Sequence, residues 1–324
     1  MNHFTNDIGY HEPLVSVVVV TYNSARTVID TLNSIKNQSY QILELVVSDD
    51  GSTDNTIKLC NEWIYNNKQR FVSASLLTTD KNTGTVKNLN RGVKASKGTW
   101  IKGLAADDAL VHSAISDYVS FVQSNKEINI CSARLLLMPE NKNTNLEPIR
   151  LSYEKYFNAV SSDYSTQKRL IYGNAYVFPG PGWFFSRELY NEVGGFDEKY
   201  ILMEEWPFAN AVLNHGYRIF PLDKELVIYR VSSNSVSHQT INSELGNRTF
   251  FNDYRHYFYR TKLWQQLFHF RFDFLLRDLI YYECRNSQYK NGVGCWQGKV
   301  LNFLLRHLGR SNSSTKQSRG DLNK

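Results

Sequence analysis

The feature that most constrains the fold is a regular alternation of apolar runs and amphipathic stretches over residues 14–138. The first run, at 14–20, reads LVSVVVV, and further runs follow at 43–48, 72–78, 100–104 and 128–138. Short, uninterrupted β-branched runs are typical of strands buried on both faces of a parallel sheet. Apolar residues at helical spacing lie between them, over 25–37, 57–64, 86–93 and 111–122. The alternation predicts an α/β fold with parallel strands joined by right-handed crossovers.

Beyond about residue 140 the pattern loosens. The stretch 141–146 is predicted as a loop, and a Pro-Gly-Pro-Gly turn at 179–182 precedes a short strand at 183–186. A helix is expected over 204–215, ended by Gly216, with further strands at 217–220 and 226–230. The last residues, 309–324, are rich in Ser, Asn and Lys and are predicted to be disordered.

Composition narrows the class of protein. With 42% hydrophobic and 21% charged residues in 324, the chain is globular and can bury a full core. The first 13 residues are polar and lack the apolar core of a signal peptide, which favours a cytoplasmic protein. The four cysteines are scattered without a CxxC pair, so neither a zinc site nor a disulfide framework is expected.

Polar residues follow four of the predicted strands, where ligands bind in parallel α/β sheets. They include two carboxylate pairs, Asp49-Asp50 and Asp107-Asp108. Carboxylates can accept bonds from a base or ribose and can hold a divalent metal, while a lysine near a helix start can bind phosphate. Each acidic pair alone is equally explained as a turn with a helix cap. The chain contains neither GxGxxG nor GxxxxGK[ST], which disfavours a dinucleotide fold or a P-loop.

Several runs resemble one known family. The segments PLVSVVVVTYN, DDGSTDNT and DKNTGTVKNLNRGVKASKGTWIKGLAADD, followed by ELYNEVGGFDEKYILMEEWPFANAVLNHGYRI, are similar to the inverting family 2 glycosyltransferases, including bacterial O-antigen and capsular polysaccharide enzymes. The resemblance covers about residues 13–237. It implies a GT-A fold, a Rossmann-like, mostly parallel sheet flanked by helices, to which we add a C-terminal amphipathic helical segment. It implies transfer of a sugar from a nucleotide-sugar, UDP-sugar first among them, with inversion to a β-linkage.

The resemblance also implies roles for residues. On the donor side they line the nucleotide pocket (Thr21, Asn23), bind the base (Asp50) and lie by the base and phosphates (Asn82, Lys87). Asp107 stands at the position of the metal ligand, for Mn²⁺ or Mg²⁺. The family's preceding ribose-binding aspartate is Ala105 here, so Asp108 is expected to share that role.

The acidic pair Glu204-Glu205 matches a segment that is usually Glu-Asp, which makes Glu205 the expected general base. A carboxylate must take the proton from the acceptor hydroxyl as it attacks. The alternative is that both acids only complement the helix dipole. Trp183 and Trp206 could stack on sugar rings or belong to the core, and His238 is a weak further candidate.

The C-terminal region is basic and amphipathic. Residues 255–310 contain ten Lys and Arg against three Asp and Glu, and charges interrupt both apolar stretches, 263–282 and 293–308. Such helices tend to lie in a membrane interface rather than span it. Without a nucleic-acid-binding motif we expect no nucleic-acid partner. A membrane role would make the acceptor a polyprenyl-diphosphate-linked saccharide at the inner face of the bacterial cell membrane; the alternative is that these helices cover the enzyme's own core.

We divide the chain into an extension at 1–12, a GT-A domain at 13–237, a helical segment at 238–308 that is the candidate for membrane association, and a tail at 309–324. Within the domain, 13–138 is expected to bind the nucleotide-sugar and 139–237 to form the acceptor side. Because of Ala105 and Glu205, a catalytically impaired nucleotide-sugar-binding or scaffold protein of the same pathway is the alternative function. A sugar nucleotidyltransferase ranks last, since no Gly-rich activation loop with a basic residue lies near the N-terminus.

Overall fold

A computed structural model describes residues 12–141, 144–173, 180–231 and 244–264. The chain forms two compact units, Met1–Asp253 and Tyr254–Lys324. In the second unit the described residues are the end of helix α10 (Glu244–Tyr257) and a π-helical turn, η3 (Phe258–Lys262). The predicted tail, the helical stretch beyond residue 264, His238 and the extension at 1–11 lie outside the described residues.

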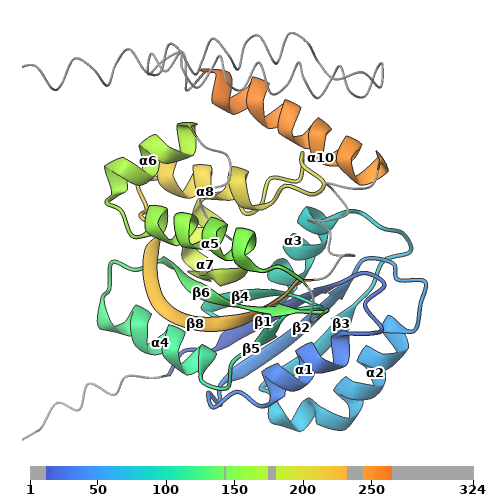
Figure 1. Ribbon diagram of the computed structural model, residues 1–324. Helices are drawn as coiled ribbons and strands as arrows, with labels where there is room; N and C mark the ends of the chain where they lie inside the picture. Colours follow the sequence, from blue (N-terminus) through green and yellow to red (C-terminus); the bar gives the residue numbers. More distant parts are fainter. Residues whose placement is uncertain (1–11, 142–143, 174–179, 232–243, 265–324) are drawn as a thin grey trace, which may run out of the picture. The chain divides into compact units, whose positions relative to one another are not determined.

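The first unit contains a sheet of eight strands in the order β3-β2-β1-β4-β7-β6-β8-β5 (Figure 1). Four of them, β1 to β4, run parallel and come from the first half of the chain. The bounds are β1 (Val15–Thr21), β2 (Leu43–Asp49), β3 (Ser73–Leu77), β4 (Trp100–Ala105), β5 (Ala109–Leu110), β6 (Ile130–Pro139), β7 (Trp183–Ser186) and β8 (Phe220–Val231). This mixed α/β sheet flanked by helices confirms the predicted fold class.

Strand β1 is buried on both faces, which explains its uninterrupted apolar run. Val17 and Val19 belong to a core shared with helices α1 (Val28–Lys36) and α2 (Thr56–Asn67). Val18 faces helix α3 (Thr85–Ala95), where Gly92 has no room for a side chain: a Cβ there would lie 2.4 Å from Val18 Cγ1. Helices therefore cover both faces of the sheet here. Because β1 to β4 are parallel, their carboxyl ends all lie at the same edge of the sheet.

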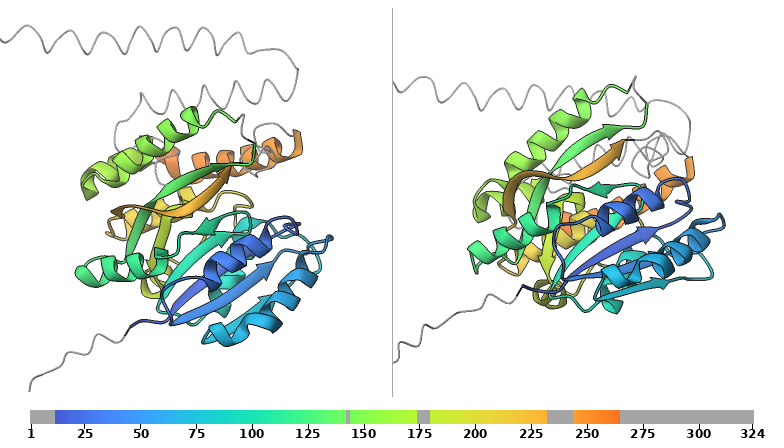
Figure 2. Two further views of the ribbon diagram at one scale, coloured as in Figure 1. Left: turned by 60° about the horizontal axis from the view of Figure 1, so that its bottom comes forward. Right: turned by 90° about the horizontal axis from the view of Figure 1, so that it is seen from below.

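The second half of the sheet departs from simple alternation. The predicted fifth strand, β6, does not pair with β4, because β7 inserts between them and runs antiparallel to both. The strand predicted at 226–230 belongs to a longer strand, β8, and the strand predicted at 217–220 is wrong except for Phe220, where β8 begins. The pairing of β8 with β6 shifts register near Arg134. The two strands curl away side by side in both views of Figure 2.

Helices and short turns complete the unit. After α2 comes the 3₁₀ turn η1 (Lys68–Arg70), and a second turn, η2 (Gly180–Gly182), precedes β7. The remaining helices are α4 (Ala114–Ser124), α5 (Glu147–Val160), α6 (Tyr164–Gly173), α7 (Arg187–Glu192) and α8 (Glu205–Asn214). Within the described ranges, none of the helices combines the length and hydropathy that crossing a bilayer requires. Cys60 and Cys131 are buried free thiols, and the other two cysteines lie outside the described residues.

Candidate functional site

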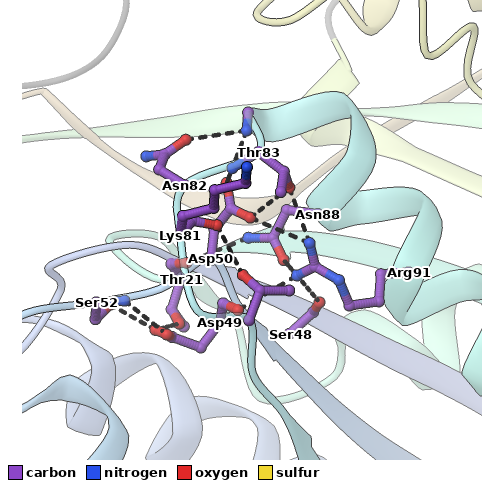
Figure 3. A network of polar contacts seen from close by, with 12 residues as sticks. Thr21, Ser48, Asp49, Asp50, Ser52, Lys81, Asn82, Thr83, Asn88 and Arg91 are labelled. Carbon is purple, nitrogen blue, oxygen red and sulfur yellow. Dashed lines mark hydrogen bonds and ion pairs between the residues drawn. The ribbon is translucent and has the colours of Figure 1, made fainter.

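The ends of β1 and β2 are joined by a network of polar contacts (Figure 3). Asp49, fully buried, accepts from the Thr21 hydroxyl at 2.6 Å and from the backbone N–H and hydroxyl of Ser52 at 2.8 and 2.5 Å. The turn between them is tight, because Gly51 has φ +76° and a Cβ there would lie 2.8 Å from the Lys81 backbone. Thr21 is predicted to line the nucleotide pocket, but in this structure its hydroxyl donates its hydrogen bond to Asp49.

Asp50 is buried at the centre of the same network. One carboxylate oxygen accepts from the backbone N–H groups of Thr83 and Gly84 at 2.9 and 2.8 Å. The other accepts from the Thr83 hydroxyl at 2.6 Å and forms an ion pair with Arg91 at 3.1 Å. A carboxylate offers about four acceptor sites, and all are used here. Base binding by Asp50 stays a prediction, and it requires one of these donors to be exchanged.

Three other predicted donor-side residues lie at the surface of this edge. Asn23, in a left-handed conformation at φ +50°, accepts from the Thr53 backbone N–H at 2.9 Å and so ties two loops together. The Asn82 side chain is exposed and accepts from the Gly84 N–H at 2.9 Å. Lys87 is exposed in the first turn of α3, and its charge acts on Glu198.

A second acidic group follows β4. Asp108 is 3% exposed and accepts from the backbone N–H of Arg230 at 3.0 Å. The Arg230 side chain donates to the backbone carbonyl of Asp107 at 3.0 Å and pairs with Asp30 on α1 at 3.3 Å. Burial raises the pKa of both Asp107 and Asp108 above the ordinary value, and their mutual repulsion adds to the effect on Asp108. Arg230 thus connects β8 to this turn.

The chemistry of this group fits a divalent cation. No described side chain donates a hydrogen bond to the Asp107 carboxylate, although that carboxylate lies deep enough for its pKa to rise. Mg²⁺ and similar hard cations often take only one or two protein carboxylates and complete their shell with substrate phosphates. The described residues contain no group of three or more His, Cys, Asp or Glu that could hold a metal alone. Asp107, with Asp108 beside it, would therefore share a metal with a bound diphosphate.

The predicted base lies at the start of α8. Glu205 is the first residue of the helix and Glu204 precedes it, both partly buried. Burial raises the pKa of Glu205, the charge of Glu204 raises it further, and a 2.8 Å hydrogen bond from the Gly180 N–H opposes the rise. A base whose pKa is raised toward neutrality is well matched to proton abstraction near physiological pH.

Tyr153 on α5 connects the two acidic groups. Burial raises the pKa of its phenol, and the neighbouring Tyr229 and the charges of Glu205 and Asp108 add to the rise. Its ring packs edge-on against Tyr229 of β8 at 5.6 Å and against Tyr156 at 6.1 Å between centroids. Acids from the end of β4 and the start of α8 therefore share one neighbour, beside partly exposed tyrosine rings.

Sequence reasoning missed three of these residues. Arg91 of α3 bonds to Asp50 and Arg230 of β8 to Asp108, and Tyr153 lies on a helix that the pattern did not predict. A signal for Arg230 was present in the Tyr-Arg pair that ends β8. The two tryptophans weighed as sugar platforms, Trp183 and Trp206, are buried at 3% and 4% exposure and pack in the core.

Comparison with protein families places the chain. The model of glycosyl transferase family 2 matches residues 16–194, more than half of the sequence. The protein belongs to glycosyl transferase family 2, and its fold is of the GT-A type. The matched range includes both strand-end acidic pairs and stops before Glu205.

Relatives agree with this placement. An uncharacterized glycosyltransferase of Haemophilus influenzae is 31% identical over 130 residues, 40% of this chain, and the match spans only 39% of that protein's length. A PGL/p-HBAD biosynthesis glycosyltransferase of Mycobacterium tuberculosis is 26% identical over 197 residues, 60% of this chain and 68% of that protein.

Solved structures share the fold. Staphylococcus aureus TarS (residues 1–349, with UDP-GlcNAc) superposes with a TM-score of 0.54 at 19% identity, covering 86% of this chain and 74% of TarS. The mannosyltransferase PcManGT of Pyrobaculum calidifontis, solved with GDP-Man and Mn²⁺, gives a TM-score of 0.58 at 17% identity, covering 92% of this chain and 81% of PcManGT.

Proposed function

We propose that this glycosyltransferase is metal-dependent and inverting, and that it moves a sugar from a nucleotide-sugar, a UDP-sugar first among them, to a hydroxyl of a lipid-linked saccharide. The acceptor would be carried on a polyprenyl diphosphate during O-antigen or capsule assembly, with the protein peripheral on the inner face of the cell membrane. Solved neighbours that hold UDP-GlcNAc, or GDP-Man with Mn²⁺, support the donor class. The basic, amphipathic C-terminal sequence supports the membrane-bound acceptor.

The observation that carries the proposal is that separate elements hold two acidic groups: the Gly180 N–H donates to Glu205 at the start of α8, and Arg230 of β8 donates to Asp107 and Asp108 after β4. Tyr153 of α5 lies within electrostatic range of both groups. An inverting transfer needs a base on one side of the anomeric carbon and stabilisation of the leaving group on the other. Acids at the start of α8 and after β4 supply these two functions from separate elements around one neighbour.

Each residue has a task in this mechanism. Glu205 takes the proton from the acceptor hydroxyl as that oxygen attacks in line, which inverts the anomeric centre and turns an α-linked donor into a β-linked product. Asp107, assisted by Asp108, would hold Mn²⁺ or Mg²⁺. When bound, such an ion neutralises charge on the departing diphosphate. Arg230 keeps the two aspartates in place through Asp108 Oδ1 and the Asp107 carbonyl.

The donor half would provide the nucleotide pocket. Thr21, Asn23, Asp50, Asn82 and Lys87 all lie at the edge where β1, β2 and α3 meet. We assign this edge, within residues 13–138, to the nucleotide, and residues 139–237 to the acceptor. The exposed side chains of Asn23 and Asn82 offer the first contacts to an incoming nucleotide, and Asp50 would bind the base by exchanging one of its present donors.

The test is release of nucleoside diphosphate by the full-length protein, with Mn²⁺ or Mg²⁺, with and without acceptor. A screen of UDP- and GDP-sugars against a synthetic lipid-linked GlcNAc or GalNAc identifies both substrates. Acceptor-dependent release that disappears with EDTA supports the proposal. Donor binding without turnover on any acceptor would instead favour the impaired binding or scaffold protein, which Ala105 and Glu205 keep as the second candidate.

A further inference from the structure

Strand β4 contains a buried lysine in an otherwise apolar segment. Lys102 is 0% exposed, and its ammonium donates to the carbonyl of Pro181 at 2.5 Å and to that of Gly103 at 2.9 Å. The ring of Tyr118 lies 5.9 Å from the ammonium. Burying an ammonium is costly unless its hydrogen bonds are made. An apolar residue would fill the same space at lower cost, which indicates that the two hydrogen bonds of the ammonium have a role.

The lysine holds the turn η2. Its bond to Pro181 fixes the middle residue, while the Tyr118 hydroxyl donates to the carbonyl of Gly182 at 2.8 Å. Gly182 is pressed against β6, since a Cβ there would lie 2.4 Å from the carbonyl oxygen of Ala133. The turn is therefore tied to the sheet at two successive residues.

The first residue of this turn touches the predicted base. The Gly180 N–H donates to Glu205 Oε1 at 2.8 Å. A Cβ on Gly180 would lie 2.6 Å from that oxygen and 2.9 Å from Glu205 Cγ, so a larger residue here would displace the Glu205 side chain. A chain of three links thus runs from Lys102, through the turn, to the Glu205 carboxylate.

We propose that Lys102 is a positioning residue for the transfer reaction: by holding η2 against the sheet, it keeps the Gly180 amide on Glu205 and so fixes the orientation and proton affinity of the base. The proposal rests on the proposed function of Glu205. The lysine itself touches no substrate in this account.

Other titratable groups lie near both Glu205 and the Lys102 ammonium. Glu205 is faced by Glu204 on its own helix and by Tyr153 and Tyr156 from α5. Around the ammonium lie Asp108 after β4 and Cys131 on β6. Burial lowers the pKa of Lys102 to about 7, and Asp108 opposes this. Among these groups the Gly180 amide alone lowers the pKa of Glu205, so its loss should raise that pKa.

The test compares the pH dependence of kcat/KM for the full-length wild type, Lys102→Met and Gly180→Ala, with Lys68→Met on the exposed turn η1 as matched control. The base works when deprotonated. Loss of its donor should therefore move the acidic limb to higher pH by about half to one unit, as the loss of one hydrogen bond predicts. Activity at pH 7 should fall about three- to tenfold in both variants and recover at higher pH. The affinity for nucleoside diphosphate and the Lys68→Met profile should not change.

Two outcomes overturn the proposal: an acidic limb unmoved in either variant, or activity lost equally at every pH. If Lys102→Met does not fold, Gly180→Ala decides alone, and an unmoved limb there rejects the link to the base. Failure of the proposed function is separate, because Glu205→Gln would then remain active or the wild type would not transfer sugar. In that case ¹³C NMR titration of labelled glutamate carboxyls, assigned with Glu205→Gln, measures the same shift without turnover; an unchanged midpoint overturns the proposal.

Discussion

Two groups of acidic residues, the pair after β2 and the acids after β4 and at the start of α8, differ in how their carboxylates are hydrogen-bonded. After β2, Asp49 and Asp50 accept bonds from hydroxyls, backbone N–H groups and Arg91, and their loops are tied into one network. After β4 and at the start of α8, the acids are buried with few donors, and the pKa of each is raised. The residues look alike in the sequence, but the first group stabilises loops, whereas the second is suited to binding a cation or a proton.

The largest effect should follow from Glu205→Gln. The amide cannot take the acceptor proton, so kcat should fall about a thousandfold, within the range for loss of a general base. Donor affinity, measured by calorimetry with UDP-sugar and Mn²⁺, should stay within about twofold of wild type, because the proposal assigns Glu205 to the acceptor hydroxyl. Activity near wild type would place the base elsewhere.

Asp50→Asn should destabilise the fold. It removes the ion pair with Arg91 and sets an amide against the donors of Thr83 and Gly84, which we expect to cost about 3 kcal/mol. Urea unfolding measures the change. The matched control is Asp223→Asn, an exposed partner of Arg134, which should cost no more than about 1 kcal/mol. If Asp50→Asn lowered the free energy of unfolding as little as the control does, the contrast between the two acidic groups would be removed.

Asp107→Asn should act on metal binding rather than on stability. Mn²⁺ affinity in the presence of nucleoside diphosphate should weaken at least about tenfold, because a carboxylate ligand is lost. The midpoint of urea unfolding should change little, since no described side chain donates to this carboxylate. Asp50→Asn serves as the reverse control, with stability lost and Mn²⁺ affinity in the absence of nucleotide kept. The account fails if the two variants exchange these phenotypes.

Glu204→Gln should have the smallest effect, and it tests the electrostatic coupling between Glu204 and Glu205 at the start of α8. The charge of Glu204 raises the pKa of Glu205, so its removal should lower that pKa. Since the base is active when deprotonated, the acidic limb of kcat/KM should move to lower pH, by up to about one unit. Glu188→Gln on the exposed face of α7 is the control. A limb that moves upward would contradict the assigned coupling.

The parallel half of the fold was predictable because strand and helix periods are local properties of the sequence. Residues 14–104 fold almost as expected, and burial of β1 between α1, α2 and α3 explains why its apolar run is continuous. The insertion of β7 between β4 and β6 was not predictable, since it depends on pairing between distant segments. Helices α5 and α6 were missed because their apolar spacing is weak.

For the candidate site, the sequence identified which acids end up at strand ends but not which are satisfied. That distinction depends on donors from elsewhere, such as Arg91 for Asp50, Arg230 for Asp108 and the Gly180 amide for Glu205. Lys102 did leave a visible signal, as a charged residue within an apolar strand. The structure adds the hydrogen bond from Lys102 to the Pro181 carbonyl, which the sequence pattern could not predict.

The most direct measurement is an anomalous diffraction map from crystals of the full-length protein grown with Mn²⁺ and a nucleoside diphosphate. The account predicts a manganese peak within about 2.5 Å of an Asp107 carboxylate oxygen, with diphosphate oxygens completing its shell. A manganese ion bound instead to Asp49 or Asp50, with none at Asp107, would contradict the assignment of metal binding to the acidic group after β4.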